Sequence, residues 1–371
     1  MSAMQYPDWD TFMTDWNEFI KGSFGDREPF PTLAPEVPSF MSRPVAASSR
    51  DLEGADVAII GAPYVATTHD TYAGVSRDEW LSAPKRVRQQ SARYQSGYIQ
   101  DFGLDVFDIL RVVDFGDAPI PEEVMRVQSA ENILLAQQAV EEKVGQVLDA
   151  GAIPIVIGQN SPCSSYAIAK PIAERTTGRV GCVSLDTHWD IQPLDFLSRD
   201  PRIAGSASWK HKMYEFHDNM HPQHLVEIGE RGMLEKQSLV EAYINQGARF
   251  ISSWEIREGL GMKGVAQELD RAYKGTDAVY VHFDMDVMGG AGPAPGDILG
   301  EAVEPIGLSD YEIIKIAHEV GKRGVSGMSF ICIPPGSAIV YRVIVYIVMY
   351  MLAGIAMSRT DGTALLPSRG I

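Results

Sequence analysis

Two short stretches of this chain carry side chains of the kind that bind metal ions. The segment VSLDTHWD places Asp186, His188 and Asp190 at alternate positions after a run of apolar residues. Alternate residues of an extended chain point the same way, so the three side chains can face one point. Carboxylates together with an imidazole suit a borderline divalent ion such as manganese, nickel, iron or zinc. The alternative is a polar strand end whose aspartates cap backbone groups.

A second pair of carboxylates closes another apolar run. Asp284 and Asp286 stand two residues apart in FDMD, and the loop VMGGAGPAPG that follows lets backbone come close to a ligand. By itself this pair could equally cap backbone groups. Together, four carboxylates and a histidine at strand ends predict a binuclear metallohydrolase, in which two ions share bridging carboxylates and activate one water.

A third stretch has the same form but different polar residues. The segment IVIGQNSPCSS is an apolar run followed by Asn160, Ser161 and Ser164, without a histidine. The sequence therefore raises the question of whether the metal site is complete.

The elements that must position these residues alternate between strands and helices. Helices are predicted over 82–94, 121–150, 238–247 and 308–324, and strands over 57–63, 110–117, 153–158, 180–186, 224–229, 249–255, 278–284 and 324–333. The strands are continuous apolar runs, which is typical of a parallel sheet covered by helices on both faces. We therefore predict an α/β fold with three αβα layers and a mainly parallel central sheet. Ligands of such sheets bind outside the carboxyl ends of the strands, where the polar motifs fall.

The chain is predicted to form one domain preceded by an arm. Residues 1–50 are rich in proline and aromatic residues and are expected to form an N-terminal arm with one short helix, while 51–371 form a single domain. Residues 343–357 contain no charge but are shorter than the roughly 20 residues of a membrane span, so a buried helix is expected. Residues 209–221, WKHKMYEFHDNMH, are expected to form a packed loop, with a substrate mouth as the alternative.

Composition narrows the classes of function. The 371 residues carry a net charge of −17 and are 45% hydrophobic, which argues against binding to nucleic acid or to an anionic membrane. Three widely spaced cysteines do not suggest a disulfide framework, and no signal peptide is recognisable, so a cytoplasmic location is expected.

The order of the motifs resembles that of the ureohydrolase family, which includes arginases and agmatinases. The matching pieces are GAPYVATT, SAPKRVRQQS, VVDFGD, DTHWD, EIGERG and FDMD. The resemblance implies a ureohydrolase-like fold and attack of a metal-bridging hydroxide on a guanidinium carbon, with release of urea or a similar product.

The resemblance also implies how the ligands would be shared. Asp186 and Asp284 would bridge two ions. Asp190 would serve one of them, the A ion, and His188 and Asp286 would serve the other, the B ion. Four converging carboxylates repel one another without a cation. A single ion in the B site, or a nearby lysine or arginine, is expected to relieve that repulsion.

The chain departs from the family pattern at four places. Ser161 stands where the family has the histidine of the A ion. GSASW (205–209) replaces a His-Gly-Thr turn, Ile331 replaces a glutamate near the substrate, and Gly289-Gly290 replaces Asp-Pro. These changes predict that the A site is degraded and that the B site keeps its ligands.

The DTHWD form of the motif, with its tryptophan, resembles that of one branch of the family. This branch contains the nickel-dependent guanidine and biguanide hydrolases, which include metformin hydrolase. In that branch a metal-loaded subunit can assemble with a paralogous subunit whose metal motifs are degraded. The resemblance implies that this chain is the degraded, non-catalytic partner in a hetero-oligomer of trimer or hexamer type, with nickel or manganese in the complex and one ion or none in this chain.

Two other readings stay open. The chain could be an active hydrolase of guanidines or amidines that uses one ion or an altered pair. It could also be a binding or regulatory protein on a retired enzyme scaffold, outside any hydrolase complex.

Overall fold

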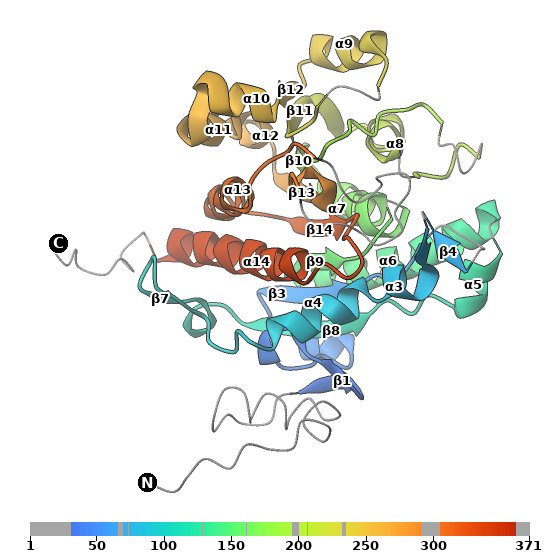
Figure 1. Cartoon of the computed structure of the whole chain (residues 1–371), viewed down its shortest axis with the longest axis vertical. Helices are drawn as coiled ribbons and strands as arrows, with labels where there is room; N and C mark the ends of the chain where they lie inside the picture. Colours follow the sequence, from blue (N-terminus) through green and yellow to red (C-terminus); the bar gives the residue numbers. More distant parts are fainter. Residues whose placement is uncertain are drawn as a thin grey trace, which may run out of the picture.

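Eight parallel strands form the central sheet of this chain in the computed structural model (Figure 1). The structure describes residues 31–65, 70–72, 74–127, 129–160, 162–194, 200–205, 207–231, 235–290 and 305–360. The strand order is β12-β11-β10-β13-β14-β9-β3-β8, and each neighbouring pair is parallel. The strands are β3 (Val57–Gly61), β8 (Val112–Asp117), β9 (Ile153–Ile157), β10 (Val180–Leu185), β11 (Met220–Ile228), β12 (Arg249–Ile251), β13 (Ala278–Asp284) and β14 (Gly327–Ile331).

Helices cover both faces of the sheet, which confirms the predicted three-layer α/β architecture. One face packs on α4 (Ala83–Ser91), α11 (Gly261–Glu268), α12 (Asp270–Tyr273), α13 (Asp310–Arg323) and α14 (Ala338–Arg359). The other packs on α6 (Ala130–Asp149), α7 (Ala167–Arg175), α8 (Trp209–Phe216) and α9 (Gln237–Asn245). Strand side chains alternate between the two cores: Ile59 and Ile155 enter the first, and Ile60 and Val156 enter the second.

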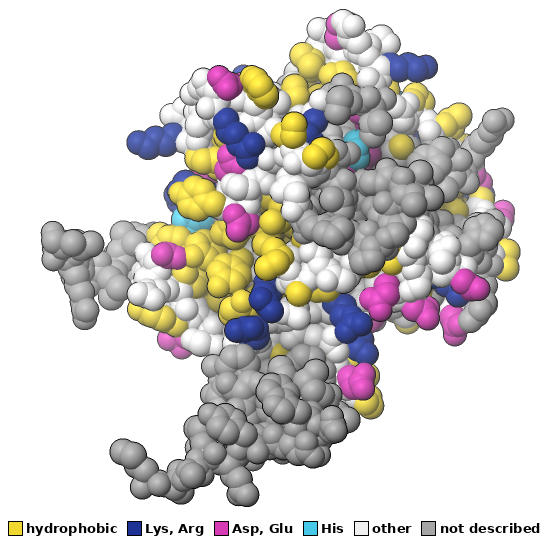
Figure 2. Space-filling view, viewed as in Figure 1, with side chains coloured by type: hydrophobic (Ala, Val, Ile, Leu, Met, Phe, Trp, Pro, Cys, Tyr) yellow, Lys and Arg dark blue, Asp and Glu magenta, His cyan; other side chains and the backbone are white. Residues whose placement is uncertain are grey.

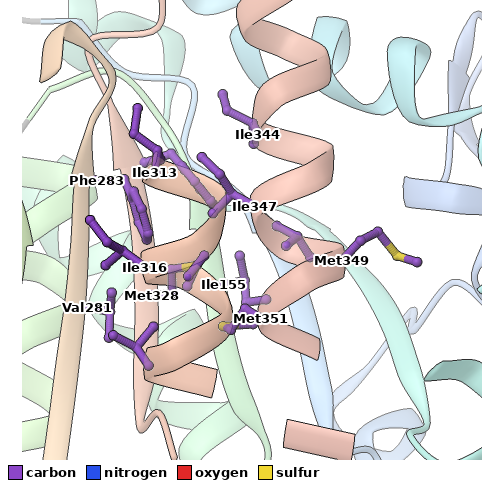
Figure 3. Packing of buried hydrophobic residues seen from close by; sticks show 14 of the residues in the cluster. Ile155, Val281, Phe283, Ile313, Ile316, Met328, Ile344, Ile347, Met349 and Met351 are labelled. Atoms are coloured by element: carbon purple, nitrogen blue, oxygen red, sulfur yellow. The ribbon is translucent and has the colours of Figure 1, made fainter. Parts of the chain in front are cut away.

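Figure 3 shows the first core from close by. Ile155, Val281, Phe283 and Met328 extend from the strands, and Ile313, Ile316, Ile344, Ile347 and Met351 meet them from α13 and α14. All of these side chains are at most 1% exposed. Their burial is the main stabilising contribution of this layer.

The apolar segment near the carboxyl end is a core helix. In the part of the chain that the structure describes, α14 is the one helix long and apolar enough to cross a membrane, and 72% of its most apolar window is buried inside the molecule. The expectation of a buried helix over 343–357 is therefore confirmed, and the helix is longer than that run at both ends.

Short elements complete the fold around the sheet. They are β1 (Thr32–Ala34), β2 (Val37–Pro38), η1 (Phe40–Ser42), η2 (Ser49–Leu52), β4 (Thr71–Tyr72), β5 (Val75–Ser76), α3 (Arg77–Leu81), β6 (Tyr98–Ile99), β7 (Leu104–Asp105), η3 (Val106–Asp108), α5 (Glu122–Arg126), η4 (Pro162–Tyr166), α10 (Ser253–Glu255), η5 (Ile256–Leu260) and η6 (Met285–Val287).

The described part of the predicted arm packs on the domain. Phe40 and Met41 are fully buried in the first core, and the backbone NH of Phe40 donates to Asp114 Oδ2 on β8 at 2.8 Å. Residues 1–30, with the predicted short helix, lie outside the described residues. The boundary at residue 50 stays a prediction.

Three predicted elements differ from the structure. The single helix over 121–150 is two helices, because Ser129 is extended and its hydroxyl accepts from the Asn132 NH, so that α6 begins after it. The strand over 249–255 ends at Ile251, because Ser252 caps α10 in the same way. Residues 209–221 were predicted to form a packed loop, but they form α8 and, after a short turn, the start of β11.

Candidate metal centre

The two carboxylate motifs meet at the carboxyl ends of β10 and β13. These strands are neighbours, with Leu185 opposite Phe283, so Asp186 and Asp284 follow at the same edge of the sheet. Their side chains are 0% and 3% exposed. The sheet therefore brings together segments about 100 residues apart in the chain.

Three of the predicted ligands form a compact cluster. A nitrogen of His188 and one carboxylate oxygen each of Asp186 and Asp286 lie within 4.8 Å of one another. His188 Nδ1 is 3.1 Å from Asp286 Oδ2 and 3.9 Å from Asp186 Oδ1. The cluster contains one of the two predicted bridging aspartates together with both B-site residues of the predicted ligand set.

Backbone groups hold the cluster in place. The NH of His188 donates to Asp186 Oδ1 at 2.7 Å, and the NH of Thr187 donates to Asp286 Oδ1 at 3.1 Å. Arg231, from the turn after β11, donates through Nη2 to the Asp286 carbonyl at 3.1 Å and also to the Thr187 hydroxyl. Arg231 of the EIGERG motif therefore links the two loops that carry the candidate metal ligands.

Asp190 and Asp284 do not join this cluster. Asp190 has a positive φ of 51°, and its Oδ2 accepts from the indole Nε1 of Trp209 at 2.9 Å. Asp284 Oδ1 accepts the NH of Asp286 at 3.0 Å. In each of them one carboxylate oxygen accepts a hydrogen bond from the protein, as it also does in Asp186 and Asp286.

A lysine that the sequence analysis did not single out completes the site. Lys210, in the first turn of α8, is fully buried, and its Nζ lies 2.9 Å from Asp186 Oδ2 and 3.2 Å from Glu227 Oε2. It also donates to the His188 carbonyl at 3.2 Å. A cation near the carboxylates was expected, but nothing in its spacing identified Lys210, which is 24 residues from Asp186.

The buried charges shift one another's protonation. Burial would lower the pKa of His188, but Asp286 and the other carboxylates outweigh it and raise that pKa to about 11. Burial likewise opposes the charge of Lys210, yet Asp186 and Glu227 raise its pKa well above the usual range. Burial, and then neighbouring carboxylates, raise the pKa of Asp190 and of Asp284.

The donor set fits one divalent ion. Asp186, His188 and Asp286 supply converging oxygen and nitrogen atoms, and Asp286 Oδ2 has no hydrogen-bond donor other than the facing imidazole. A second ion at Asp190 would compete with Trp209 for Asp190 and with Lys210 for Asp186. Among the described residues, the ligand atoms that lie close together are therefore those of Asp186, His188 and Asp286.

The first polar loop is only partly described. Gln159 is 1% exposed and bonds the backbone of Ile333 twice, donating to its carbonyl at 2.9 Å and accepting its NH at 2.8 Å. This ties the ends of β9 and β14 together. Ser161 lies outside the described residues, so its place at the A site stays a prediction.

The other departures from the family pattern have structural consequences where they are described. Ile331 is 2% exposed and packs in the core, where it offers no polar group. Trp209, the last residue of GSASW, is fully buried with its ring 4.5 Å from that of His282. Residues 291–304, after Gly289-Gly290, lie outside the described part.

Comparison with known proteins agrees with this fold. A model of the Arginase family matches residues 55–353. A formimidoylglutamase of Halobacterium salinarum is 25% identical over 288 residues, which are 74% of this chain and 84% of that protein. An agmatinase of Chromobacterium violaceum is 26% identical over 297 residues, 80% of this chain and 81% of that protein.

Solved structures show the same architecture. Proclavaminate amidino hydrolase from Streptomyces clavuligerus superposes with a TM-score of 0.68 at 23% identity, covering 88% of this chain and 100% of that one. A Trypanosoma cruzi formiminoglutamase with Mn²⁺ superposes with a TM-score of 0.66 at 23% identity, covering 86% and 99%.

Proposed function

The chain belongs to the arginase family of C–N hydrolases, and from that membership we propose that it is the non-catalytic subunit of a heteromeric guanidine or biguanide hydrolase. Its partner would be a paralogous subunit with an intact Gly-Gly-Asn/Asp-His motif. The complex would release urea or guanylurea and an amine.

The observation that carries this proposal is the ion pair between the Lys210 ammonium and the Asp186 carboxylate. In a binuclear centre, two ions polarise the substrate and lower the pKa of a shared water. Here one oxygen of Asp186, a predicted bridging ligand, faces an ammonium at 2.9 Å. Together with the Asp190–Trp209 hydrogen bond, this supports a set of ligands for one ion.

The remaining cluster supports a single ion with a structural task. His188, Asp186 and Asp286 would hold it, and Thr187 and Arg231 orient the two loops. Carboxylate and imidazole donors suit nickel or manganese. The manganese in the related formiminoglutamase supports this class of metal.

The substrate class rests on the family and on one sequence motif. The related agmatinase and amidino hydrolase are named for guanidine-type substrates. The tryptophan of DTHWD, which suggests the guanidine and biguanide branch, is fully buried, with its ring 5.6 Å from Phe250. Trp189 would therefore support the fold of the metal loop rather than contact substrate.

An exposed aromatic surface supports assembly with a partner. We call the α14 surface the set Tyr94, Tyr98, Tyr311, Tyr346 and Tyr350, which line two adjoining hollows beside α14. Tyr98, Tyr311 and Tyr346 are 51%, 65% and 40% exposed. Figure 2 shows hydrophobic side chains gathered in this region, between α13 and β7. Tyrosine-rich surfaces of this kind are typical of protein interfaces.

The Asp186, His188 and Asp286 cluster also favours a second candidate function. A single ion held there could activate water in the chain by itself, which would make it an unusual mononuclear amidine hydrolase. This candidate predicts metal-dependent turnover by the purified chain.

Co-expression separates the two candidates. The chain alone, its paralogue alone and the co-expressed pair are loaded with Ni²⁺ or Mn²⁺, and urea or guanylurea release from guanidine and a biguanide is measured. We expect activity only when the paralogue is present, and co-elution of the two chains. Turnover by this chain alone, or a fully active paralogue that never co-elutes with it, would overturn the proposal.

A further inference from the structure

Lys210 is a fully buried amine that makes two hydrogen bonds at the metal centre and an ion pair with a neighbouring carboxylate. An ammonium has three donors and no acceptor. Three oxygen atoms surround Nζ: Asp186 Oδ2 at 2.9 Å, the His188 carbonyl at 3.2 Å and Glu227 Oε2 at 3.2 Å. The ammonium is therefore fixed between β10 and β11.

Glu227 is the second half of this arrangement. It lies on β11 opposite Ser184 of β10, and its side chain is fully buried. A carboxylate inside a parallel sheet is costly unless a cation accompanies it. Lys210 contacts both carboxylates, so its single positive charge is shared between two neighbouring strands. Burial outweighs that charge and raises the pKa of Glu227 well above its usual value.

The residue before Lys210 bonds a second of the A-site carboxylates, that of Asp190. Trp209 donates its indole NH to Asp190 Oδ2 at 2.9 Å. The first two residues of α8 thus occupy one oxygen of Asp186 and one of Asp190. These are two of the three aspartates that the A ion was expected to use.

We propose that the Lys210 ammonium, fixed by Asp186 and Glu227, takes the place of the second metal ion and limits this chain to one divalent ion at Asp186, His188 and Asp286. The inference deepens the proposed function and rests on it. It assigns Lys210 as a positioning residue that keeps the carboxylate loops folded without a second metal ion.

The test uses variants of the full chain and two readouts that do not depend on activity. Lys210→Met removes the ammonium, and Lys210→Met/Glu227→Gln also removes the carboxylate that it pairs with. Lys212→Met is the matched control, because Lys212 lies on the same helix but pairs with half-exposed Glu215. Thermal midpoints are measured in chelator and in Mn²⁺, and bound Mn²⁺ per chain is counted by elemental analysis after dialysis.

The expected pattern is specific. The wild type and Lys212→Met bind at most one Mn²⁺. In chelator, Lys210→Met melts at least about 5 °C below the wild type, because it leaves buried carboxylates unpaired. The double variant recovers part of that loss. Mn²⁺ raises the midpoint of Lys210→Met more than that of the wild type, with a second ion bound.

Two Mn²⁺ ions in the wild type, or a Lys210→Met midpoint equal to that of Lys212→Met, would overturn the inference. If Lys210→Met does not fold, the inference is tested by the number of Mn²⁺ ions that the wild type binds and by the thermal midpoint of the double variant. Turnover by the wild-type chain with one ion bound would contradict the proposed function but leave the role of Lys210 intact, so the two failures are distinguishable.

Discussion

His188 Nδ1 faces Asp286 Oδ2 at 3.1 Å, so a proton or a metal ion can bridge them, but not both. The carboxylates overcome the effect of burial and raise the pKa of His188 from 6.5 to about 11. This ion pair stabilises the metal-free fold fully below pH 6.5, and the contribution is lost as the pH rises through about 11.

Metal uptake should therefore release one proton and strengthen with pH. We expect the affinity for Mn²⁺ to rise about tenfold per unit between pH 6 and pH 8. Titration calorimetry in buffers of different ionisation enthalpy measures both quantities. His188→Gln should abolish the dependence, whereas His211→Gln, a change on α8 away from the cluster, should keep it. A pH-independent affinity in the wild type would contradict this account.

The spacing of the motifs singled out three residues that the structure brings together, and their binding of a metal ion stays a prediction. Asp186 and His188 come from one strand end and Asp286 from its neighbour, and the structure places them together. Lys210 and Trp209 could not be found in the same way, because they reach the site through the packing of α8. Periodicity within a segment carries no information about which distant helix contacts it.

Two motifs shared with the family form a structural ion pair between elements. Arg88 on α4 donates to both oxygens of Asp114 on β8, at 2.8 and 2.9 Å, and to Asp117 at 2.5 Å. Arg88 and Asp114 are fully buried. The motifs SAPKRVRQQS and VVDFGD are therefore explained by packing of α4 on the sheet.

Arg88→Met should destabilise the fold by about 3–5 kcal/mol, because it leaves a buried carboxylate without its cation. Denaturant unfolding of the full chain measures the change. Arg86→Met on the same helix, where Arg86 is 43% exposed, should cost less than about 1 kcal/mol. An equal decrease in the free energy of unfolding of the two variants would show that the buried Arg88–Asp114 pair does not contribute more than an exposed one.

The contact between α13 and α14 depends on two glycines. A Cβ at Gly354 would lie 2.4 Å from the His318 carbonyl oxygen, and one at Gly321 would lie 2.2 Å from that of Met351. The two helix backbones approach too closely for any side chain there.

Gly354→Ala should lower the free energy of unfolding by about 1–3 kcal/mol, although alanine favours helix. Gly259→Ala is the control, because Gly259 is exposed and its Cβ would meet nothing within 4 Å. Chemical denaturation compares the pair. A Gly354→Ala protein as stable as the wild type would mean that the helices pack differently.

Apolar runs predicted every strand of the main sheet, because both faces of the sheet are buried. Element ends were harder to predict. The break between α5 and α6 and the short β12 each depend on one serine that caps a following helix. A serine inside a helical pattern fits either outcome, and only tertiary packing selects one.

At the scale of the whole molecule, the α14 surface is the region that we expect to contact the partner subunit. Tyr311→Glu/Tyr346→Glu places charges on this surface without entering the core. The double variant should shift the assembly to smaller species in light scattering after size-exclusion chromatography. Leu135→Glu, a change at a 52% exposed position on α6, should not. An unchanged mass in the tyrosine variant would place the interface elsewhere.

The overall architecture followed from the alternation of strands and helices, but the assembly could not be predicted in that way. The strand order brings β10 beside β13, although nearly 100 residues separate them, and only the folded sheet shows it. The identity of the partner depends on surfaces shaped by several elements. The buried α14 illustrates this, since most of its apolar residues lie in the core, whereas Ile339 and Tyr346 reach the surface.

The most direct test of the central claim is the number of divalent ions that the purified chain binds at saturating Ni²⁺ or Mn²⁺, with guanidine and biguanide hydrolysis assayed on the same sample. The account predicts at most one ion per chain and no turnover. Two ions per chain together with turnover would contradict it.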